Sequence, residues 1–582
     1  MNNLLAKSSI FLFLGQVGCR SCGDDQPTET GNNDTHNPTP DSEDSVDSGE
    51  FGDSGDSGEF GDSGDTGDTG DTGAGLLDED EDGFIAADDC DDTNPDINPD
   101  ATEICNDGID QDCNPNSPVC EISLAESDAV LLGEDAGHYA GVSVDPAGDV
   151  NGDGYADLLI GAKRFDSEGE EEGAAYLVYG PIDGKGGDLD EFGVRLDGVD
   201  ASSNAGVQVV GLQDLDGDGY DEVLVSATTM GTDGLTKNGE VYYFPGSTLM
   251  ANGPGSVINL AEAPATWTGS SGFQWLGGSF SDVGDVDGDA VPDLLIGATG
   301  TGENVSFGGT VYVMSGQNIL DSVGTARIND AYQYAIHGID EQGYLGSRLT
   351  GPGDMNGDGL AEIVIGAPLL NENGSESGSV FIISNPSVGS MNVDASIARL
   401  NGSAAGDQLG AAVSPAGDIN DDGYMDLWMG SAGADESAAN GGSSYLILGS
   451  TDLATLNGLA TENAFATISG MDTDAGMGST LAGDGDFNGD GIDDLLAGGA
   501  DSGSSGEGGA WLFLGPFEGT IGSDQARAHL IGDEPGDHAG TSVNFSPSLG
   551  EEDTDWLVIG AWQDDENGID AGAVFLVGSL SE

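Results

Sequence analysis

The sequence predicts an all-β protein whose main part is a seven-bladed β-propeller with four strands per blade. The 582 residues include 100 glycines and 37% apolar residues, which is too much glycine for a helical bundle but enough apolar side chain to bury a core. A pattern of glycines and acidic loops recurs every 62 to 71 residues. Each unit carries short apolar runs rich in β-branched and aromatic residues, which is strand composition. Four-stranded units in seven copies, with no helical pattern between them, are typical of a propeller.

The repeat follows a fixed spacing. The stretch DVNGDGYADLLIGA at residues 149–162 recurs five more times, and a glycine stands 16 residues before the first Asp of each copy. These glycines are Gly133, Gly198, Gly269, Gly338, Gly402 and Gly470, and a second glycine follows each by eight residues. The same spacing from Gly532 leads to Gly540, to Ser548 in place of the Asp, and to LVIGA at 557–561. A seventh unit therefore exists without the acidic loop.

Each unit reads as four strands, a to d. Strand a enters the acidic loop, strand b leaves it (DLLIGA), strand c is the next apolar run (AAYLVY) and strand d is the last (VRLDG). The first d strand, at 129–132, precedes any a strand, and the last unit ends on strand c near Val577. We therefore expect the N-terminal d strand to complete the C-terminal blade, because this pairing removes open sheet edges.

The chain begins with features of export. Residues 4–18 are apolar but too short to span a membrane, and Lys7 precedes the apolar centre, so residues 1–22 are expected to be a signal peptide. The run LGQVGC ending at Cys19 resembles a lipoprotein signal, which implies lipidation of that cysteine; simple secretion stays open, and Cys22 is either an alternative anchor or a leftover thiol. Residues 23–76 are rich in Gly, Ser, Asp and Thr with almost no large apolar residue, which predicts a disordered acidic tether rather than a specific binding segment.

Residues 77–121 form a different segment, rich in Asp and Cys. In an exported chain its four cysteines predict two disulfides of undetermined connectivity among Cys90, Cys105, Cys113 and Cys120. Asp78, Asp80, Asp82 and Asp89 have the spacing of a calcium loop. The segment resembles the Asp/Cys-rich metal-binding motif of bacterial surface proteins. Calcium is preferred here over a solvated acidic knot, since close carboxylates repel one another without a cation, and over a soft metal held by thiolates.

The six acidic loops of the propeller are predicted calcium sites. Positions 1, 3, 5 and 9 offer side-chain oxygens, position 7 offers a backbone carbonyl, and the position-6 glycine, replaced by Ala290 in the third loop, permits the turn around a hard cation. Strands rather than helices flank the loops, so they are not EF-hands. Magnesium is the weaker candidate because it demands strict octahedral geometry. The predicted ligands are Asp149, Asn151, Asp153, Tyr155, Asp157; Asp214, Asp216, Asp218, Tyr220, Glu222; Asp285, Asp287, Asp289, Val291, Asp293; Asp354, Asn356, Asp358, Leu360, Glu362; Asp418, Asn420, Asp422, Tyr424, Asp426; and Asp486, Asn488, Asp490, Ile492, Asp494.

The units resemble FG-GAP repeats, as found in the propeller of integrin α subunits. The resemblance covers about residues 124–582, and the letters GAP themselves stand at 366–368. It implies a calcium-carrying propeller, often used for adhesion, and it implies no catalysis. Departures also exist, because the FG element reads Tyr139-Ala140-Gly141 in the first unit.

The net charge and the absence of catalytic motifs disfavour several classes of function. With 107 acidic and 11 basic residues the formal charge is −96, which disfavours nucleic acid and anionic lipid as partners, so membrane contact is expected only through a lipid anchor. The five histidines form no HExxH motif, and paired carboxylates are too common here to identify a glycosidase. We expect a non-catalytic cell-surface or secreted module that binds an extracellular protein or glycan. A polymer-acting enzyme with its site on a propeller face and a purely structural envelope protein remain alternatives.

The ligand is expected on the face opposite the acidic loops. There the b–c and d–a connections keep nearly constant length while their apolar and aromatic residues differ, which suits recognition. The alternative is that some of these side chains pack inward. The residues concerned are Arg164, Phe165, Met230, Phe307, Leu369, Leu370 and Trp562, with Tyr139, Trp275 and Tyr344 nearby.

Overall fold

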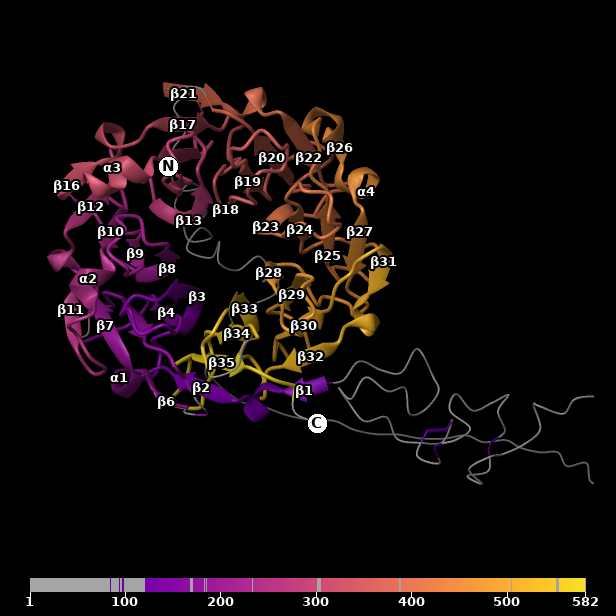
Figure 1. The fold of residues 1–582 in the computed structure, drawn as a ribbon, viewed down its shortest axis with the longest axis horizontal. Coiled ribbons are helices and arrows are strands. Elements are labelled where there is room, and N and C mark those ends of the chain that lie inside the picture. The colour runs from indigo at the N-terminus through magenta and orange to yellow at the C-terminus, as the bar shows by residue number, and fades with distance from the viewer. Residues whose placement is uncertain are drawn as a thin grey trace, which may run out of the picture. The chain divides into compact units, whose positions relative to one another are not determined.

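In the computed structural model, residues 121–580 form a β-propeller of seven sheets (Figure 1). The structure describes residues 84, 94, 97–98 and 121–580, except 168–170, 183, 185, 233, 301–304, 387–388, 504 and 551–553. The predicted signal peptide, tether, disulfide cysteines and N-terminal calcium loop, including Cys19 and Asp78 to Asp89, lie outside the described residues. No helix among the described residues is long and apolar enough to cross a membrane.

The four predicted strands are present in every blade. Blade 1 holds β3 (Ala140–Gly148), β4 (Asp157–Ala162), β5 (Ala174–Val178) and β7 (Gly193–Asp197). Blade 2 holds β8 (Ala205–Leu212), β9 (Glu222–Ala227), β10 (Glu240–Phe244) and β12 (Ala265–Thr268). Blade 3 holds β13 (Leu276–Gly284), β14 (Asp293–Ala298), β15 (Thr310–Met314) and β17 (Tyr334–His337). Blade 4 holds β18 (Arg348–Thr350), β19 (Ile363–Ala367), β20 (Ser379–Ile383) and β22 (Ala398–Asn401).

The remaining blades follow the same order. Blade 5 holds β23 (Leu409–Pro415), β24 (Leu427–Ser431), β25 (Ser443–Ile447) and β27 (Ala466–Ser469). Blade 6 holds β28 (Thr480–Gly485), β29 (Asp494–Gly499), β30 (Gly509–Phe513) and β32 (Ala528–Ile531). Blade 7 holds β33 (Ala539–Ser546), β34 (Trp556–Ala561), β35 (Ala573–Val577) and β2 (Ala129–Leu132).

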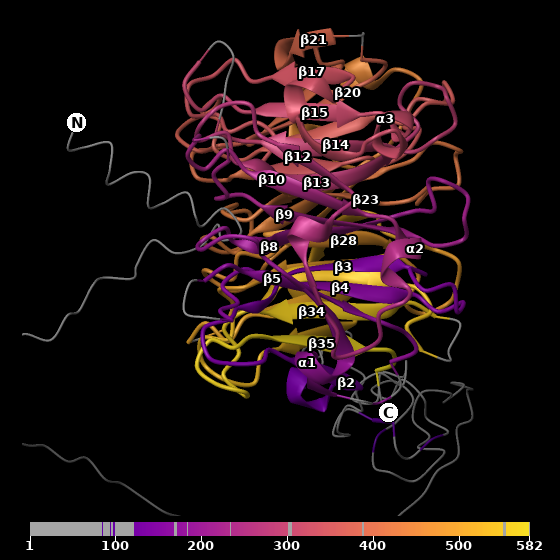
Figure 2. The ribbon, with the colours of Figure 1, turned by 90° about the vertical axis from the view of Figure 1, so that its left-hand side faces the viewer.

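The expected closure of the ring is confirmed. Strand β2 pairs antiparallel with β35, with Leu131 opposite Val574. Figure 2 shows the C-terminal strands β34 and β35 between β2 and β4, which both come from the N-terminal part of the propeller. Leu131 is fully buried, so the N-terminal strand contributes core as well as backbone pairing.

The prediction of four strands per blade was incomplete, because each sheet has a fifth, outermost strand. This strand comes from the c–d connection of the following blade and runs parallel to strand d. In order from blade 1 to blade 7, the fifth strands are β11 (Val257–Asn259), β16 (Gly324–Arg327), β21 (Gly389–Asn392), β26 (Gly458–Leu459), β31 (Gly519–Gly522), β1 (Glu121–Ser123) and β6 (Gly187–Asp188). They are two to four residues long and half exposed, so they carry almost none of the apolar signal that reveals an inner strand.

A one-turn helix follows every fifth strand and leads into strand d. These helices are η2 (Leu124–Glu126), α1 (Leu189–Phe192), η3 (Leu260–Glu262), η4 (Ile328–Asp330), η5 (Val393–Ala395), α4 (Ala460–Asn463) and η7 (Ser523–Gln525). Three further short helices, α2 (Gly246–Leu249), α3 (Gly316–Leu320) and η6 (Leu453–Leu456), precede the fifth strand. The length variation of the repeat is therefore taken up at the rim of the ring.

The core is divided among the interfaces between blades. Seven apolar clusters occur, each built from two neighbouring sheets, and the fully buried Leu158, Val558 and Val574 belong to the one between blades 7 and 1. Glycine allows the sheets to approach closely. At Gly141, φ is +81° and an added Cβ would lie 2.4 Å from the Ala573 carbonyl oxygen, which explains the second glycine of the repeat.

Candidate metal loops

The six acidic loops adopt one conformation, held by their own carboxylates. In the first loop Asp149 accepts hydrogen bonds from the backbone N–H groups of Gly152, Asp153 and Gly154, and Asp153 accepts one from Tyr155. The bond from position 7 to position 5 recurs in the other five loops at 2.9 to 3.1 Å. The carboxylates of positions 1 and 5 therefore lie on the inside of each turn.

Carboxylates converge most closely in the second and third loops. The oxygens of Asp214, Asp216 and Asp218 lie within 4.8 Å of one another, and so do those of Asp285, Asp287 and Asp289. The other four loops carry Asn at position 3, and its amide bonds a neighbouring carboxylate instead. Asn420, for example, donates to Asp422 at 3.1 Å, and Asn488 donates to Asp490 at 3.0 Å.

The position-9 carboxylates are the buried members of the loops. Asp157 accepts the backbone N–H of Val150 through one oxygen and that of Gly180 through the other. The corresponding carboxylates of loops 3, 5 and 6 are held in the same way, by position 2 and by the second residue after strand c. Position 9 therefore fixes the base of the loop to the blade.

Burial raises the pKa of every position-9 carboxyl group, and the other carboxylates of the loop add to the rise. The values are about 7 for Asp157, Asp293 and Glu362, about 8 for Glu222 and about 6 for Asp426 and Asp494. Buried negative charges at this density are unfavourable unless a cation sits among them.

The second loop contains a buried carboxylate oxygen that fits a cation ligand. Glu222 is 1% exposed, and its Oε2 accepts the N–H of Leu215 at 3.1 Å. Its Oε1 is buried and has no hydrogen-bond partner. An unpaired buried carboxylate oxygen behind three converging aspartates suits a hard divalent ion, which takes oxygen ligands.

Neighbouring loops are joined by a carboxylate that the sequence analysis did not single out. At position 8 of the second loop, Asp221 accepts the N–H of Asp149 at 2.6 Å, and Asp555 of blade 7 likewise accepts the N–H of Asp486 at 2.9 Å. These bonds join the first loop to the second, and the sixth loop to the equivalent turn of blade 7. The signal was present as an acidic position 8, but the strand register was needed to show which partner it reaches.

On the face opposite the acidic loops, the prediction of an exposed recognition surface was wrong for several of its residues. Phe165 is 2% exposed and Trp562 4%, so neither forms an exposed tip, and Met230, Tyr344 and Leu370 are buried as well. Phe165 packs on His138 and Tyr176, with the Arg195 guanidinium over its ring. The alternative of inward packing is correct for these side chains, because the b–c loops fold their apolar residues back onto the core between blades.

Blades 1 and 7 together form a basic and aromatic cluster on this face. Lys163 Nζ lies 4.9 Å from the Trp562 ring centre, Tyr139 packs edge-on against Trp562, and Arg164 donates to the Tyr139 hydroxyl at 2.9 Å. His538 stacks on Trp562 from the other side. These residues are about 400 positions apart in the sequence, so only ring closure reveals the cluster.

A third group of carboxylates lies outside the predicted loops. Oxygens of Asp533, Asp537 and Asp564 lie within 4.8 Å of one another. Burial raises the pKa of Asp537 to about 7 and that of Asp564 to about 6. The residues belong to the d–a and b–c connections of blade 7, and their spacing matches no loop motif, so sequence reasoning did not find them.

Comparison with known proteins agrees with this geometry. Residues 140–178 and 348–383 match the FG-GAP repeat family, each spanning an acidic loop with its flanking strands. The chain contains FG-GAP repeats. Residues 89–117 match a family described as "Putative metal-binding motif" (Cu-binding_MopE); this match begins at Asp89 and does not include Asp78, Asp80 or Asp82.

The FG-GAP propeller is also similar to curated proteins. It is 32% identical to integrin alpha-8 of Gallus gallus over 183 residues, which are 30% of this chain and 16% of that protein. It is 29% identical to phosphatidylinositol-glycan-specific phospholipase D of Homo sapiens over 234 residues, 38% of this chain and 25% of that protein. It is 35% identical to integrin alpha-7 of Rattus norvegicus over 151 residues, 26% and 12% of the two chains. The matches thus span a quarter or less of these relatives.

Proposed function

We propose that this protein is an exported, non-catalytic, calcium-binding propeller that acts as a cell-surface adhesion or ligand-binding module. The observation that carries the proposal is the second loop, where three aspartates converge in front of the unpaired buried oxygen of Glu222. Calcium suits this all-oxygen set better than magnesium, since it tolerates irregular geometry and six to eight ligands. When bound, calcium supplies positive charge that offsets the repulsion among the loop carboxylates.

Residues of the chain hold the ion and transmit its effect. Positions 1, 3 and 5 would contribute side-chain oxygens, position 7 its carbonyl and position 9 a carboxylate fixed to the blade. Because Asp221 of the second loop bonds position 1 of the first loop, occupancy of the second loop supports the first. The proposed role is structural stiffening of one rim, so that the ligand-binding surface is presented on a rigid ring.

A binding role is supported by the similarity of the propeller to integrin α chains. One relative is named as a phospholipase D, but the match spans a quarter of that protein, so its activity is not carried over. Export is supported by the N-terminal apolar segment and by the cysteine-rich segment that follows it.

Binding and catalysis are separated by one pair of assays on the full chain. Protein and glycan arrays, each with calcium and with EDTA, should give calcium-dependent binding to at least one class. The same preparation, incubated with extracellular polysaccharides and with glycosylphosphatidylinositol-linked substrate, should give no turnover. Turnover that survives removal of contaminants would contradict the non-catalytic role, and arrays without any calcium-dependent binding would contradict the binding role.

A further inference from the structure

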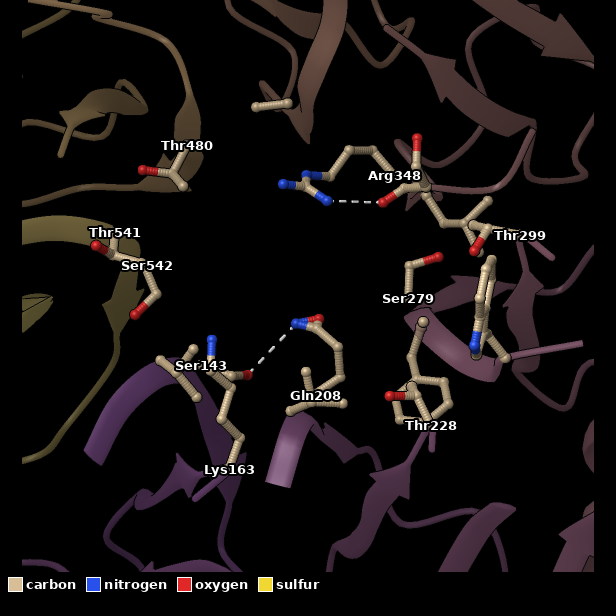
Figure 3. Close-up of a pocket in the computed structure, with 18 of the residues that line it drawn as sticks. Ser143, Lys163, Gln208, Thr228, Ser279, Thr299, Arg348, Thr480, Thr541 and Ser542 are labelled. Carbon is tan, nitrogen blue, oxygen red and sulfur yellow. Dashed lines mark hydrogen bonds between the residues drawn. The ribbon is translucent and has the colours of Figure 1, made fainter. Parts of the chain in front are cut away.

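The middle of the ring contains a cavity of about 280 Å³, lined by both polar and apolar side chains, that the metal loops and the expected ligand face do not account for (Figure 3). Water occupies about 30 Å³ per molecule, so the cavity has room for about nine waters or for one six-carbon sugar with water around it. Its lining includes Lys163 and Lys237 from b–c connections and Trp275 from a d–a connection.

The cavity is lined by several basic residues, although basic residues are rare in this chain. Of the 11 Lys and Arg residues in the sequence, three line this one cavity, namely Lys163, Lys237 and Arg348. Burial lowers the pKa of Arg348 to about 10 and that of Lys163 to about 8, with Arg164 adding to the latter shift. In a chain of charge −96, three cations that line one cavity and make no ion pair with a carboxylate among the described residues indicate a site for an anionic ligand.

The wall of the cavity is formed by the same position of strand a in each blade. The second residue after the glycine that begins each a strand faces the cavity, and six of these seven residues are polar; the seventh is Ala412. The polar members are Ser143, Gln208, Ser279, Arg348, Thr480 and Ser542. Figure 3 shows them arranged around an open centre, with the Arg348 side chain extending toward it.

Arg348 is the one charged member of this ring, and it has donors to spare. Its only hydrogen bond among the described residues runs from one terminal nitrogen to the Ser347 carbonyl at 2.8 Å, and no described carboxylate pairs with it. A guanidinium has five N–H donors in a planar arrangement that matches a carboxylate. The free edge of Arg348 therefore suits one carboxylate in the cavity.

The hydroxyl groups of the ring define the rest of the ligand. Ser279 donates to the Gly346 carbonyl at 2.6 Å, Thr480 to Gly540 at 2.7 Å and Ser542 to Gly141 at 2.8 Å, in each case across to the next blade. Since a hydroxyl has one hydrogen to donate, the lone pairs that remain accept hydrogen bonds. A bare anion offers no donors to these oxygens, whereas a ligand with its own hydroxyl groups does.

We propose that the central cavity binds a sugar acid of hexuronate size, with its carboxylate on Arg348 and its hydroxyl groups on the Ser, Thr and Gln side chains of the ring. Lys163 and Lys237 in the lining attract the anion. This site is independent of the calcium loops and of any macromolecular ligand, and it holds whether or not the proposed binding role on the outer face is correct.

Ligand-detected NMR with the full chain in saturating calcium tests the site. D-glucuronate and D-galacturonate are titrated beside D-glucose, acetate and sulfate. At least one uronate should bind at least tenfold more tightly than the other three, because glucose lacks the charge, and acetate and sulfate lack the hydroxyl groups. Absence of uronate binding overturns the proposal, and so does equal binding of acetate or sulfate, which would indicate a simple anion site.

Variants locate the site. Arg348→Met should weaken uronate binding at least tenfold, and Arg348→Lys should weaken it less, since lysine keeps the charge but not the paired donors. Arg399→Met is the matched control: it removes a cation of the same blade that pairs with Glu372 outside the cavity lining, and should leave affinity unchanged. If Arg348→Met fails to fold, Gln208→Glu decides, because a carboxylate in the ring should abolish binding. Wild-type affinity in Arg348→Met, or in Gln208→Glu, overturns the proposal.

Discussion

Blades 1 to 6 and blade 7 stabilise the a–b turn, here called the corner of the blade, with different side chains. In six blades the a–b turn is held by carboxylates, with a buried acid at position 9. In blade 7 the same spacing places Ser548 at position 1, Leu549 at position 2 and Trp556 at position 9. Leu549 is fully buried and Trp556 is 6% exposed, and both pack into the apolar cluster between blades 7 and 1. An indole thus replaces a charged group, and this corner needs no ion.

Blade 7 closes its a–b turn by apolar packing, whereas the other six turns carry buried carboxylates whose charge, under the proposed function, calcium compensates. The carboxylate corners gain stability only when a cation compensates their charge, while the apolar corner is stable through burial alone. Blade 7 also contains the junction of the chain ends, where strand β2 is held by pairing with β35. Under the proposed function, the a–b turn of the blade that closes the ring therefore carries no calcium site.

The largest expected effect is that of chelation. At ten times Kd each calcium site adds about 1.4 kcal/mol, so six independent sites add about 8 kcal/mol, which is comparable with the whole stability of a typical domain. EDTA should therefore lower Tm strongly in thermal melts, and millimolar calcium should restore it. Magnesium at the same concentration should restore less. Melts that superimpose with and without EDTA would refute the difference between the two kinds of corner.

Trp556→Ala should remove the apolar corner. Emptying this position deletes a large buried side chain next to Leu549, with an expected loss of about 3 to 5 kcal/mol in the free energy of unfolding. The loss should be the same in calcium and in EDTA, in contrast to Asp149→Ala, whose effect should largely disappear once calcium is removed. Denaturant unfolding of both variants under both conditions measures this. A Trp556→Ala effect that depends on calcium would contradict the account.

The third prediction concerns pH at the junction of blades 7 and 1, where Asn544 donates to Asp145 at 3.0 Å. Burial raises the pKa of Asp145 to about 7, and Asp484 and Asp282 add to the rise. The unfolded value is about 3.9. Between these values the unfolded chain releases the proton first, so the contribution of Asp145 to stability is greatest below about pH 4 and falls as pH rises to 7.

Asp145→Asn isolates this effect. In saturating calcium, the wild-type protein should lose stability relative to the variant by up to about 1.4 kcal/mol per pH unit between pH 5 and pH 7, and the difference should level off above pH 7. Denaturant unfolding of both proteins at matched pH values gives the difference directly. Parallel pH profiles would show that Asp145 does not titrate in this range.

The smallest expected effect lies in the third loop. Ala290 occupies the position-6 site with φ +67°, a conformation that costs alanine about 1 kcal/mol. Ala290→Gly should therefore raise calcium affinity at this loop about fivefold. The fifth loop supplies a matched comparison, since Asp421 replaces the position-4 glycine with φ +58°, and Asp tolerates this region better than Ala. Asp421→Gly should gain less. Calcium titrations in which Ala290→Gly gains nothing, or gains less than Asp421→Gly, would overturn this ranking.

The blades and the ring closure were predictable from the sequence because the same spacing of glycines occurs in every unit. Seven copies of one spacing identified the blades, the missing loop of blade 7 and the pairing of β2 with β35. The fifth strands were not predictable, because segments such as Gly458–Leu459 are too short to show a period. The role of Trp556 was hidden for a related reason: its position was read as a missing loop, and only packing shows that it replaces the buried acid.

The sequence also did not predict which side chains of the loops and inner strands point inward. The sequence placed Phe165 and Trp562 on loops, where exposure is the ordinary expectation, and the fold turned them into the core. Conversely, the cavity ring lies at one register position of each inner strand, where Ser, Gln, Arg and Thr look like unremarkable polar residues. Closure of the strands into a ring brings them together, and one sequence repeat alone contains no sign of it.

The central claim is that six corners of this propeller hold calcium and the seventh does not. The most direct measurement is the calcium content of the full chain by elemental analysis, after equilibration at known free calcium, beside a variant with Asp149→Ala and Asp214→Ala. The account predicts six propeller ions per chain at saturation, one more if the segment around Asp78 is loaded, and two fewer in the double variant. A wild-type content of two or fewer, or an unchanged content in the double variant, would contradict it.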